Sequence, residues 1–297
     1  MKTSFEQSLW SATAIAPPPS PPLEGLHEAD VTIVGAGYTG LSAALHLARE
    51  GRRVAVLESE QPGFGCSGRN GGQVNPGSTK MAPSEVLDTL GPRWGEKFLE
   101  FGARSCDLVF ELIERYQIDC EAVRPGYVQG GYGERGRRLN ETWAREWGER
   151  GVEITAFDRD GMESLIGSRS YEWGLLDPRG GNVQPLSYAR GLANAAVREG
   201  ASLHGSSRAD AIRRDGAGWL VSTPSGQIRS PVVILATNGY TDDLWPGLRQ
   251  SIVPTTSFVT ATKPLGHNTL ATVLPGRHAV SETARVIVYY RLDQAGR

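Results

Sequence analysis

The sequence contains few of the residues that build disulfide frameworks or metal sites. Three of its 297 residues are cysteines, Cys66, Cys106 and Cys120. Their spacing matches neither a zinc motif nor a paired disulfide set. An odd number of scattered cysteines indicates free thiols, which are typical of a reducing compartment. We therefore expect a cytoplasmic protein without a metal site.

The sequence also lacks a strong charge bias and long apolar runs. With 31 basic and 33 acidic residues the net charge is −2, so neither nucleic acid nor an anionic membrane is expected as a partner. No apolar run is long enough to span a bilayer, and no basic region followed by an apolar core begins the chain. Hydrophobic residues make up 39% of the sequence, as in globular proteins, and the length favours two domains.

A βαβ unit is the clearest structural pattern. Five prolines between positions 17 and 22 exclude a helix there, so residues 1–28 are predicted to form a flexible N-terminal arm. The apolar runs 31–34 and 54–57 are typical of strands buried on both faces of a parallel sheet. Residues 41–50 between them carry apolar side chains at i, i+3, i+4 and i+7, which predicts a helix. Strand, helix and strand together predict a parallel α/β, Rossmann-type domain.

The rest of the chain mixes helical and alternating patterns. Residues 60–79 form a glycine-rich loop. Helices are predicted at 84–101, 103–117, 134–150 and 186–199, a hairpin at 211–213 with 219–223, and strands at 122–132, 152–157, 232–236, 252–262 and 284–292. We expect a nucleotide-binding domain over 29–120 and 181–240, and a discontinuous antiparallel α+β substrate domain over 121–180 and 241–297.

The first predicted helix is preceded by a G-x-G-x-x-G motif. Its first glycine permits the turn, its second lets a diphosphate approach the backbone, and its third lets the helix pack on the strand. A carboxylate, Glu58, follows the second strand at the distance expected for one that binds ribose hydroxyls, and Ser59 adjoins it. A glycine turn without a ligand is the alternative, and the motif alone does not separate NAD from FAD. The motif residues are Gly35, Ala36, Gly37, Tyr38, Thr39 and Gly40.

The segment after Glu58 resembles a known family. Residues 63–73 read Gly-Phe-Gly-Cys-Ser-Gly-Arg-Asn-Gly-Gly-Gln. This loop is similar to that of the D-amino-acid oxidase family of FAD-dependent oxidoreductases, and more narrowly to its γ-glutamylputrescine oxidase-like branch. Residues 9–13, 181–189, 233–240 and 253–254 resemble the same branch, so the likeness covers nearly the whole chain.

The resemblance implies FAD as the cofactor and assigns further residues to it. Ser67 would donate to a phosphate oxygen, and Arg69 would offset phosphate charge or stabilise reduced flavin. A surface salt bridge is the alternative for Arg69, and an ordinary turn is the alternative for the corner at 236–239. Cys66 is interpreted as a small-residue substitution rather than a covalent flavin link. The other implied cofactor contacts are Gly68, Asn70, Gly71, Gly72, Gln73, Ala209, Thr237, Asn238 and Gly239.

The implied activity is oxidation of the C–N bond of an amine or amino acid, with oxygen or another electron acceptor. No histidine is assigned a role, and no catalytic residue is identified. Tyr127, Tyr132 and Arg179 are candidates for contact with the substrate, although plain packing is favoured for each. The family continues beyond the turn predicted at 293–296, which suggests a C-terminally truncated enzyme. A dinucleotide-binding fragment with little turnover is therefore the main alternative, and an NAD-dependent dehydrogenase is disfavoured by the 63–77 loop.

Overall fold

The computed structural model describes residues 5–77 and 81–297. They divide into two compact units. The first combines the residues up to Asn70 with Tyr116–Cys120 and Pro185–Val259, and the second combines Gly71–Arg115, Glu121–Gln184 and Thr260–Arg297. The predicted domains are discontinuous too, but they assign residues 71–115, 181–184 and 241–259 to the other domain.

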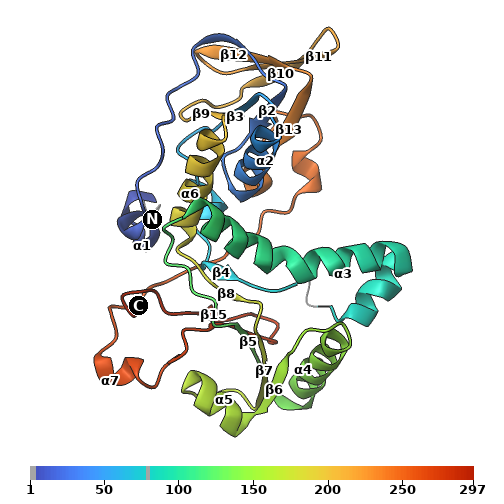
Figure 1. Cartoon of the computed structure of the whole chain (residues 1–297), viewed down its shortest axis with the longest axis vertical. Coiled ribbons are helices and arrows are strands. Elements are labelled where there is room, and N and C mark those ends of the chain that lie inside the picture. The colour runs from blue at the N-terminus through green and yellow to red at the C-terminus, as the bar shows by residue number, and fades with distance from the viewer. Residues whose placement is uncertain (1–4, 78–80) are drawn as a thin grey trace. The chain divides into compact units, whose positions relative to one another are not determined.

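A parallel sheet forms the centre of the first unit. Its strands follow the order β13 (Val232–Leu235), β2 (Val31–Val34), β3 (Val54–Leu57) and β9 (Ser202–His204), and every neighbouring pair is parallel. Helices α2 (Tyr38–Arg49) and α6 (Pro185–Arg198) lie together on one face (Figure 1). Strands β2 and β3 are buried along their whole length, as is typical of strands covered on both sides, and the one polar side chain among them, Thr32, shares a hydrogen bond with Ser230. The predicted βαβ unit is confirmed.

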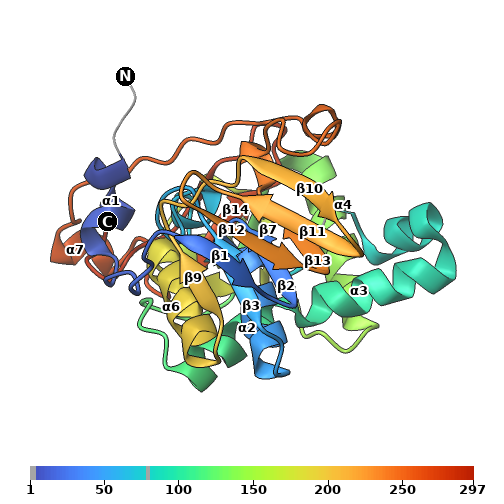
Figure 2. The ribbon, with the colours of Figure 1, turned by 90° about the horizontal axis from the view of Figure 1, so that it is seen from above.

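A second sheet covers the other face of this parallel sheet (Figure 2). It has the order β1 (Gly25–Glu28), β12 (Gly226–Ser230), β11 (Gly218–Ser222) and β10 (Ala211–Asp215). Leu57 of the parallel sheet and Val221 and Ile228 of the second sheet share one hydrophobic core. The predicted hairpin is confirmed as β10 and β11, whereas β12 was not predicted.

The N-terminal segment differs from the expected flexible arm. It contains a 3₁₀ turn, η1 (Phe5–Gln7), and a short helix, α1 (Leu9–Thr13), and it ends in strand β1, which pairs in parallel with β12. The backbone of Ile15 donates to Ser187 Oγ and accepts from Arg190 Nη1, at 3.1 and 2.6 Å. The prolines keep only residues 17–22 extended, and the segments on either side are held by these contacts.

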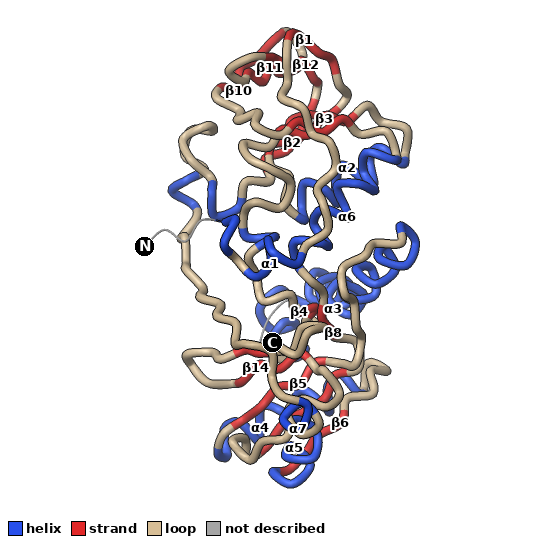
Figure 3. The backbone as a smooth tube through the Cα atoms, turned by 90° about the vertical axis from the view of Figure 1, so that its left-hand side faces the viewer, coloured by secondary structure: helices blue, strands red, loops and turns tan. Residues whose placement is uncertain are grey.

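The second unit is built on a mixed sheet with helices on both faces (Figure 3). The strand order is β15 (Tyr289–Tyr290), β14 (Ala279–Glu282), β5 (Tyr127–Gly131), β7 (Trp173–Asp177) and β6 (Thr155–Asp158). Gly131 of β5 faces α4 (Gly133–Gly148). Its neighbour in β5, Gly130, is paired with Gly174 of β7, and Gly174 faces Met162 of α5 (Arg159–Ile166). Since successive strand residues point to opposite faces, α4 and α5 cover different sides of the sheet.

Several predicted elements differ in extent. The helices predicted at 84–101 and 103–117 form one element, α3 (Pro83–Tyr116), whose break lies at Gly91 with φ 72° and ψ 161°. The loop predicted at 60–79 contains η2 (Cys66–Gly68) and strand β4 (Gln73–Val74), which pairs with β8 (Gly181–Asn182); positions 78 and 79 lie outside the described residues. Short turns and helices complete the chain: η3 (Asn238–Tyr240), η4 (Arg249–Ser251) and α7 (His267–Leu270).

The predicted strand at 252–262 is wrong, and that at 284–292 is reduced to β15. Residues 252–262 follow η4 without pairing to another strand, and Val253 and Phe258 are 84% and 85% exposed. Alternating side chains define a strand only when a neighbour supplies backbone hydrogen bonds. Across residues 5–77 and 81–297, no helix combines the length and apolar character needed to cross a membrane.

Candidate functional site

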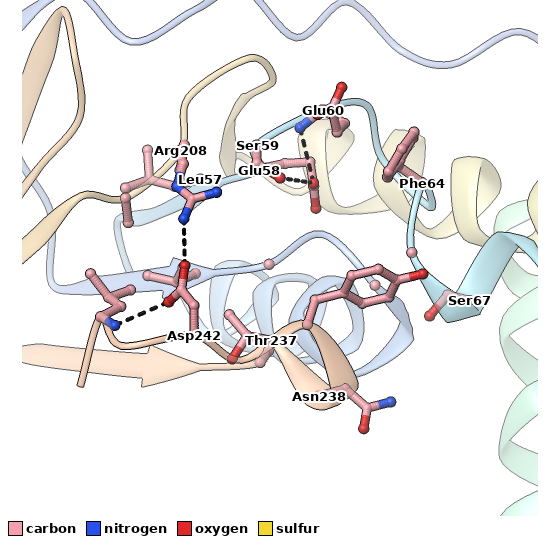
Figure 4. A pocket seen from close by; sticks show the side chains of 18 of the residues that line it. Leu57, Glu58, Ser59, Glu60, Phe64, Ser67, Arg208, Thr237, Asn238 and Asp242 are labelled. Carbon is pink, nitrogen blue, oxygen red and sulfur yellow. Dashed lines mark hydrogen bonds and ion pairs between the residues drawn. The ribbon is translucent and has the colours of Figure 1, made fainter. Parts of the chain in front are cut away.

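The first unit contains a cavity of about 310 Å³ at the carboxyl ends of β2, β3 and β13 (Figure 4). Ligands of parallel α/β sheets bind at this edge, where the loops that follow the strands converge. The glycine turn after β2, the carboxylate after β3 and the corner after β13 all border it. The residues that line it are Val34, Gly35, Gly37, Leu57, Glu58, Ser59, Glu60, Phe64, Gly65, Cys66, Ser67, Arg208, Ala209, Ala236, Thr237, Asn238, Tyr240, Asp242 and Leu244.

The three glycines of the motif are required by close backbone packing. Gly35 has φ +108°, and a Cβ there would lie 2.7 Å from the carbonyl oxygen of Ala236. A Cβ at Gly40 would lie 1.9 Å from the carbonyl oxygen of Gly35, so only glycine lets the helix start against the turn. A Cβ at Gly37 would lie 2.9 Å from Ser67 Oγ, at the wall of the cavity. This geometry agrees with the turn and helix-packing roles predicted for Gly35 and Gly40, whereas the approach of a diphosphate at Gly37 stays a prediction.

The start of α2 presents unpaired backbone donors. Ala36 N–H donates to Glu58 Oε2 at 2.8 Å, and Tyr38 N–H donates to Ser67 Oγ at 2.9 Å. The N–H groups of Gly37, Thr39 and Gly40 have no hydrogen-bond partner within the described residues. These donors lie at the positive end of a 12-residue helix, which is a favourable position for an anion.

The Glu58 carboxylate is turned toward the glycine motif. Besides the bond from Ala36, its Oε1 accepts hydrogen bonds from Glu60 N–H at 3.1 Å and from Ser59 Oγ at 3.2 Å. Figure 4 shows the side chain at the cavity wall with these contacts. Three donors keep the carboxylate in place while it borders the space beside the turn. This is the arrangement expected for a carboxylate that binds the ribose of a dinucleotide.

Ala209 supplies an unpaired donor and acceptor at the other side of the cavity. Ala209 is 7% exposed. Among residues 5–77 and 81–297, no protein group forms a hydrogen bond with its backbone N–H or C=O. Buried backbone groups are nearly always hydrogen-bonded. The side chains of Leu57 and Leu244 line the same cavity. An adjacent donor and acceptor beside apolar side chains suit the edge and face of a purine ring.

The corner after β13 closes the cavity from a third strand. Ala236 N–H donates to Val34 O at 2.8 Å, which holds the corner beside the glycine turn. Thr237 and Asn238 line the cavity, and Asn238 has φ +46°. Gly239 is outside the cavity lining, and a Cβ there would meet nothing within 4 Å. The corner therefore contributes Thr237 and Asn238, with Gly239 placed farther away.

The first part of the 63–73 loop packs against the same turn. Ser67 lies beside Gly37, and a Cβ at Gly68 would lie 2.2 Å from Gly63 O, so Gly68 serves loop packing. The Arg69 guanidinium lies beside the two adjacent rings of Phe5 and Phe64, at 4.6 and 4.5 Å from their centroids, and its Nε donates to Phe64 O at 2.7 Å. Arg69 forms no salt bridge with the described residues, so that alternative is wrong, whereas its predicted role toward the cofactor stays a prediction.

Four further loop residues are engaged by protein atoms. Asn70 Nδ2 donates to Ser67 O at 2.9 Å. Gln73 Nε2 donates to Val280 O and Tyr290 O at 2.9 and 3.0 Å, within the second unit. Gly71 O accepts from Arg291 Nε at 2.8 Å, and Gly72 O accepts from Val183 N–H at 2.7 Å. The amide donors expected to face the flavin are thus occupied within the protein.

Residues that the sequence did not indicate also border the cavity. Arg208 and Asp242 form an ion pair of 2.6 Å at its rim, as Figure 4 shows. The Tyr240 ring packs on Gly65, and desolvation raises the pKa of this tyrosine. Only the position of Arg208 next to Ala209 could have indicated it from sequence. The exposed thiol of Cys66 belongs to the same lining.

The three candidate substrate contacts are engaged inside the second unit. Arg179 forms a buried ion pair of 2.6 Å with Asp177 and stacks on Trp147 at 4.3 Å. The Tyr127 hydroxyl shares a short hydrogen bond with Ser281, and burial raises the pKa of this tyrosine. Tyr132 donates to Glu282 at 2.9 Å. The packing interpretation that the sequence favoured agrees with these contacts.

Comparison with known proteins decides the family. The family model described as "DAO: FAD dependent oxidoreductase" matches residues 30–297. The chain belongs to this family of FAD-dependent oxidoreductases. FAD is the cofactor of the family, which confirms the fold class and the cofactor predicted from the sequence.

Individual relatives show which members of the family this chain is similar to. The chain is 33% identical over 295 residues to the "Probable oxidoreductase OrdL" of Rhizobium meliloti (strain 1021), covering 98% of this chain and 67% of that protein. It is 33% identical over 301 residues to the gamma-glutamylputrescine oxidoreductase of Escherichia coli (strain K12), covering 99% and 69%. Glycine oxidase from Geobacillus kaustophilus is a structural neighbour, with a TM-score of 0.62, 26% identity, and coverage of 76% and 59%. The chain thus spans about two thirds of the length of these curated relatives.

Proposed function

We propose that the protein oxidises the C–N bond of an amine or amino acid by hydride transfer to the flavin of FAD. The observation that carries this proposal is the cavity of the first unit, which is lined by Gly37 with its unpaired amide, by Glu58 and by Ala209, next to the start of α2. Family membership supplies the reaction class, and the gamma-glutamylputrescine oxidoreductase relative suggests the kind of substrate. γ-Glutamylputrescine-like, polyamine and sarcosine-like amines are therefore the first substrates to test.

The donor set fits the adenosine diphosphate half of FAD. The amides of Gly37, Thr39 and Gly40 would hold the diphosphate, and the helix dipole adds to their effect. The hydroxyl of Ser67 would donate to a phosphate oxygen, since its oxygen already accepts from Tyr38. Glu58 would bind the ribose, and its negative charge would disfavour a 2′-phosphate. The backbone of Ala209 would bind the adenine edge, with Thr237 and Asn238 closing the corner.

Bound FAD supplies a two-electron acceptor for the amine. The amine would bind as the neutral base and would leave as an imine, which water hydrolyses to a carbonyl compound and ammonia or a smaller amine. Electrons would pass on to oxygen or another acceptor. We propose a cytoplasmic site of action and small molecules rather than nucleic acids as partners, in keeping with the nearly neutral charge.

The remaining loop residues are proposed to act indirectly. Arg69 and Asn70 would hold the loop that carries Ser67, because their donors contact Phe64 O and Ser67 O. Gly68 would permit the close packing of that loop. The contact of Gly71, Gly72 and Gln73 with the cofactor stays a prediction that rests on the resemblance alone.

Anaerobic titration of the purified protein with candidate amines tests the proposal. We expect the visible flavin absorbance to bleach with at least one amine, and hydrogen peroxide or a reduced dye to form when an acceptor is added. Bleaching by NADH but by no amine would instead indicate that a nicotinamide nucleotide reduces the flavin. A flavin that is retained but is bleached by no amine would support the alternative of a binding fragment with little turnover.

A further inference from the structure

The outer face of α3 carries a row of exposed apolar side chains. Trp94, Phe101 and Leu108 are 59%, 66% and 42% exposed. They are spaced seven residues apart, so they lie on one stripe of the helical segment that follows the break at Gly91. The opposite face of this segment, including Leu99 and Cys106, is buried. A seven-residue apolar repeat outside the core is typical of a seam that packs on another helix.

Charged residues of both signs follow one edge of this stripe. In chain order they are Arg93, Lys97, Glu100, Arg104, Asp107 and Glu111, so basic residues prevail at the start of the edge and acidic residues at its end. Glu100, Arg104 and Glu111 take part in no ion pair with the rest of the described chain, and Asp107 pairs with Arg124. Arg93 and Lys97 lie over the ring of Trp94, at 5.3 and 5.2 Å. Several charged side chains along this edge of the stripe therefore lack an ion-pair partner within the described chain, and positive and negative charges are equally numerous there.

The charges are arranged symmetrically about the centre of the stripe. Three oppositely charged pairs, 93 with 111, 97 with 107 and 100 with 104, share a midpoint at position 102, and Trp94 and Leu108 have theirs at position 101. A two-fold axis near Phe101 would lay the same helix of a second copy antiparallel on the first. With the axis at Phe101, Trp94 would face Leu108 and Phe101 would face its own copy, and each basic residue would lie within two positions of the point opposite its acidic partner.

We propose that the stripe formed by Trp94, Phe101 and Leu108 of α3 is a self-association surface, and that its occupant is the same stripe of a second copy in antiparallel orientation. Self-complementary charge argues for this occupant, because a partner of one charge sign would leave half of the edge unpaired. A contact formed by one helix from each copy is small, so the dimer is expected to be reversible.

Sedimentation velocity on the full chain, over concentrations up to about 1 mM, tests the proposal. We expect a concentration-dependent dimer, and Phe101→Glu to shift it to monomer while circular dichroism and the unfolding midpoint stay unchanged. A monomer at every concentration would overturn the proposal. A dimer that Phe101→Glu leaves intact would also overturn it, since another face would then be responsible.

Charge variants test the antiparallel register. Glu100→Arg alone places an arginine opposite Arg104 of the second copy, and Arg104→Glu alone places a glutamate opposite Glu100. Each variant should therefore dimerise at least about tenfold more weakly than the wild type. A mixture of the two variants should form a heterodimer, because both contacts then join opposite charges. Failure of the mixture to associate more strongly than either variant alone would rule out this register.

Discussion

The carboxylate of Glu58 accepts a 2.8 Å hydrogen bond from the backbone amide of Ala36, the second residue of the glycine turn. The bond joins the ends of two neighbouring parallel strands, β2 and β3. It also places a fixed negative charge beside unpaired amides that favour an anion. A carboxylate and unpaired amides are therefore adjacent in one part of the fold, which is the geometry that a dinucleotide requires.

Removing the Glu58 carboxylate should weaken cofactor binding. A hydrogen bond to a charged group contributes about 1.5–3 kcal/mol, so Glu58→Gln should raise the Kd for FAD by roughly 10- to 100-fold. Calorimetric titration of flavin-free protein measures this change. Glu60→Gln is a matched control, because Glu60 contributes its backbone amide to the Glu58 contact and keeps it after substitution. Equal losses in both variants would contradict the role of Glu58.

A side chain at Gly37 should exclude the cofactor. Since a Cβ there already lies 2.9 Å from Ser67 Oγ, Gly37→Val would displace the Ser67 loop or fill the space above the turn. We expect the purified variant to contain little flavin, by the ratio of visible to protein absorbance. Gly148→Ala is the control, because a Cβ at Gly148 meets nothing within 4 Å and its φ is ordinary. If Gly37→Val retained its full flavin content, the diphosphate could not bind above Gly37, and the account of this site would be wrong.

The base recognised at Ala209 should be adenine. Its unpaired N–H and C=O match a ring nitrogen and an amino group, whereas hypoxanthine presents a ring N–H and a carbonyl in their place. Inosine diphosphate should therefore displace FAD at least about tenfold less well than adenosine diphosphate, as expected when buried polar groups are left unpaired. Equal competition by the two nucleotides would show that the Ala209 backbone does not read the base.

The three cysteines should differ in reactivity. Cys66 is exposed at the cavity, whereas desolvation raises the pKa of the buried Cys106 thiol to about 11. Cys106 is thus almost fully protonated at pH 8, and a thiol reagent should label native, flavin-free protein at Cys66 first. The fast phase should vanish in Cys66→Ser and slow when FAD is added. Labelling of Cys66 at an unchanged rate with saturating FAD would contradict its place beside the cofactor.

The buried pair of Asp177 and Arg179 should matter for stability rather than for substrate binding. Asp177 has a fully buried side chain, and its loss would leave the guanidinium without its charge partner. Asp177→Asn should lower the free energy of unfolding by about 3 kcal/mol in urea titration. Asp160→Asn, which removes an exposed partner of Arg169, should leave the unfolding midpoint unchanged. Similar midpoints for both variants would contradict this interpretation.

Local sequence was sufficient for the glycine turn and its carboxylate. Gly35, Gly40 and Glu58 belong to one βαβ unit, so their spacing along the chain predicts their proximity. The pair of Arg208 and Asp242 joins two segments whose contact depends on tertiary packing, so the position of Arg208 next to Ala209 does not predict its contact with Asp242. The partners of the Gln73 amide could not be predicted for a related reason, because the carbonyls that accept from it come from positions 280 and 290.

Displacement of FAD by fragments of the cofactor tests the central claim most directly. If the amides at the start of α2, Glu58 and Ala209 bind the adenosine diphosphate half, adenosine diphosphate should compete with FAD for the flavin-free protein, and flavin mononucleotide should compete far less. Competition by flavin mononucleotide without competition by adenosine diphosphate would contradict the account.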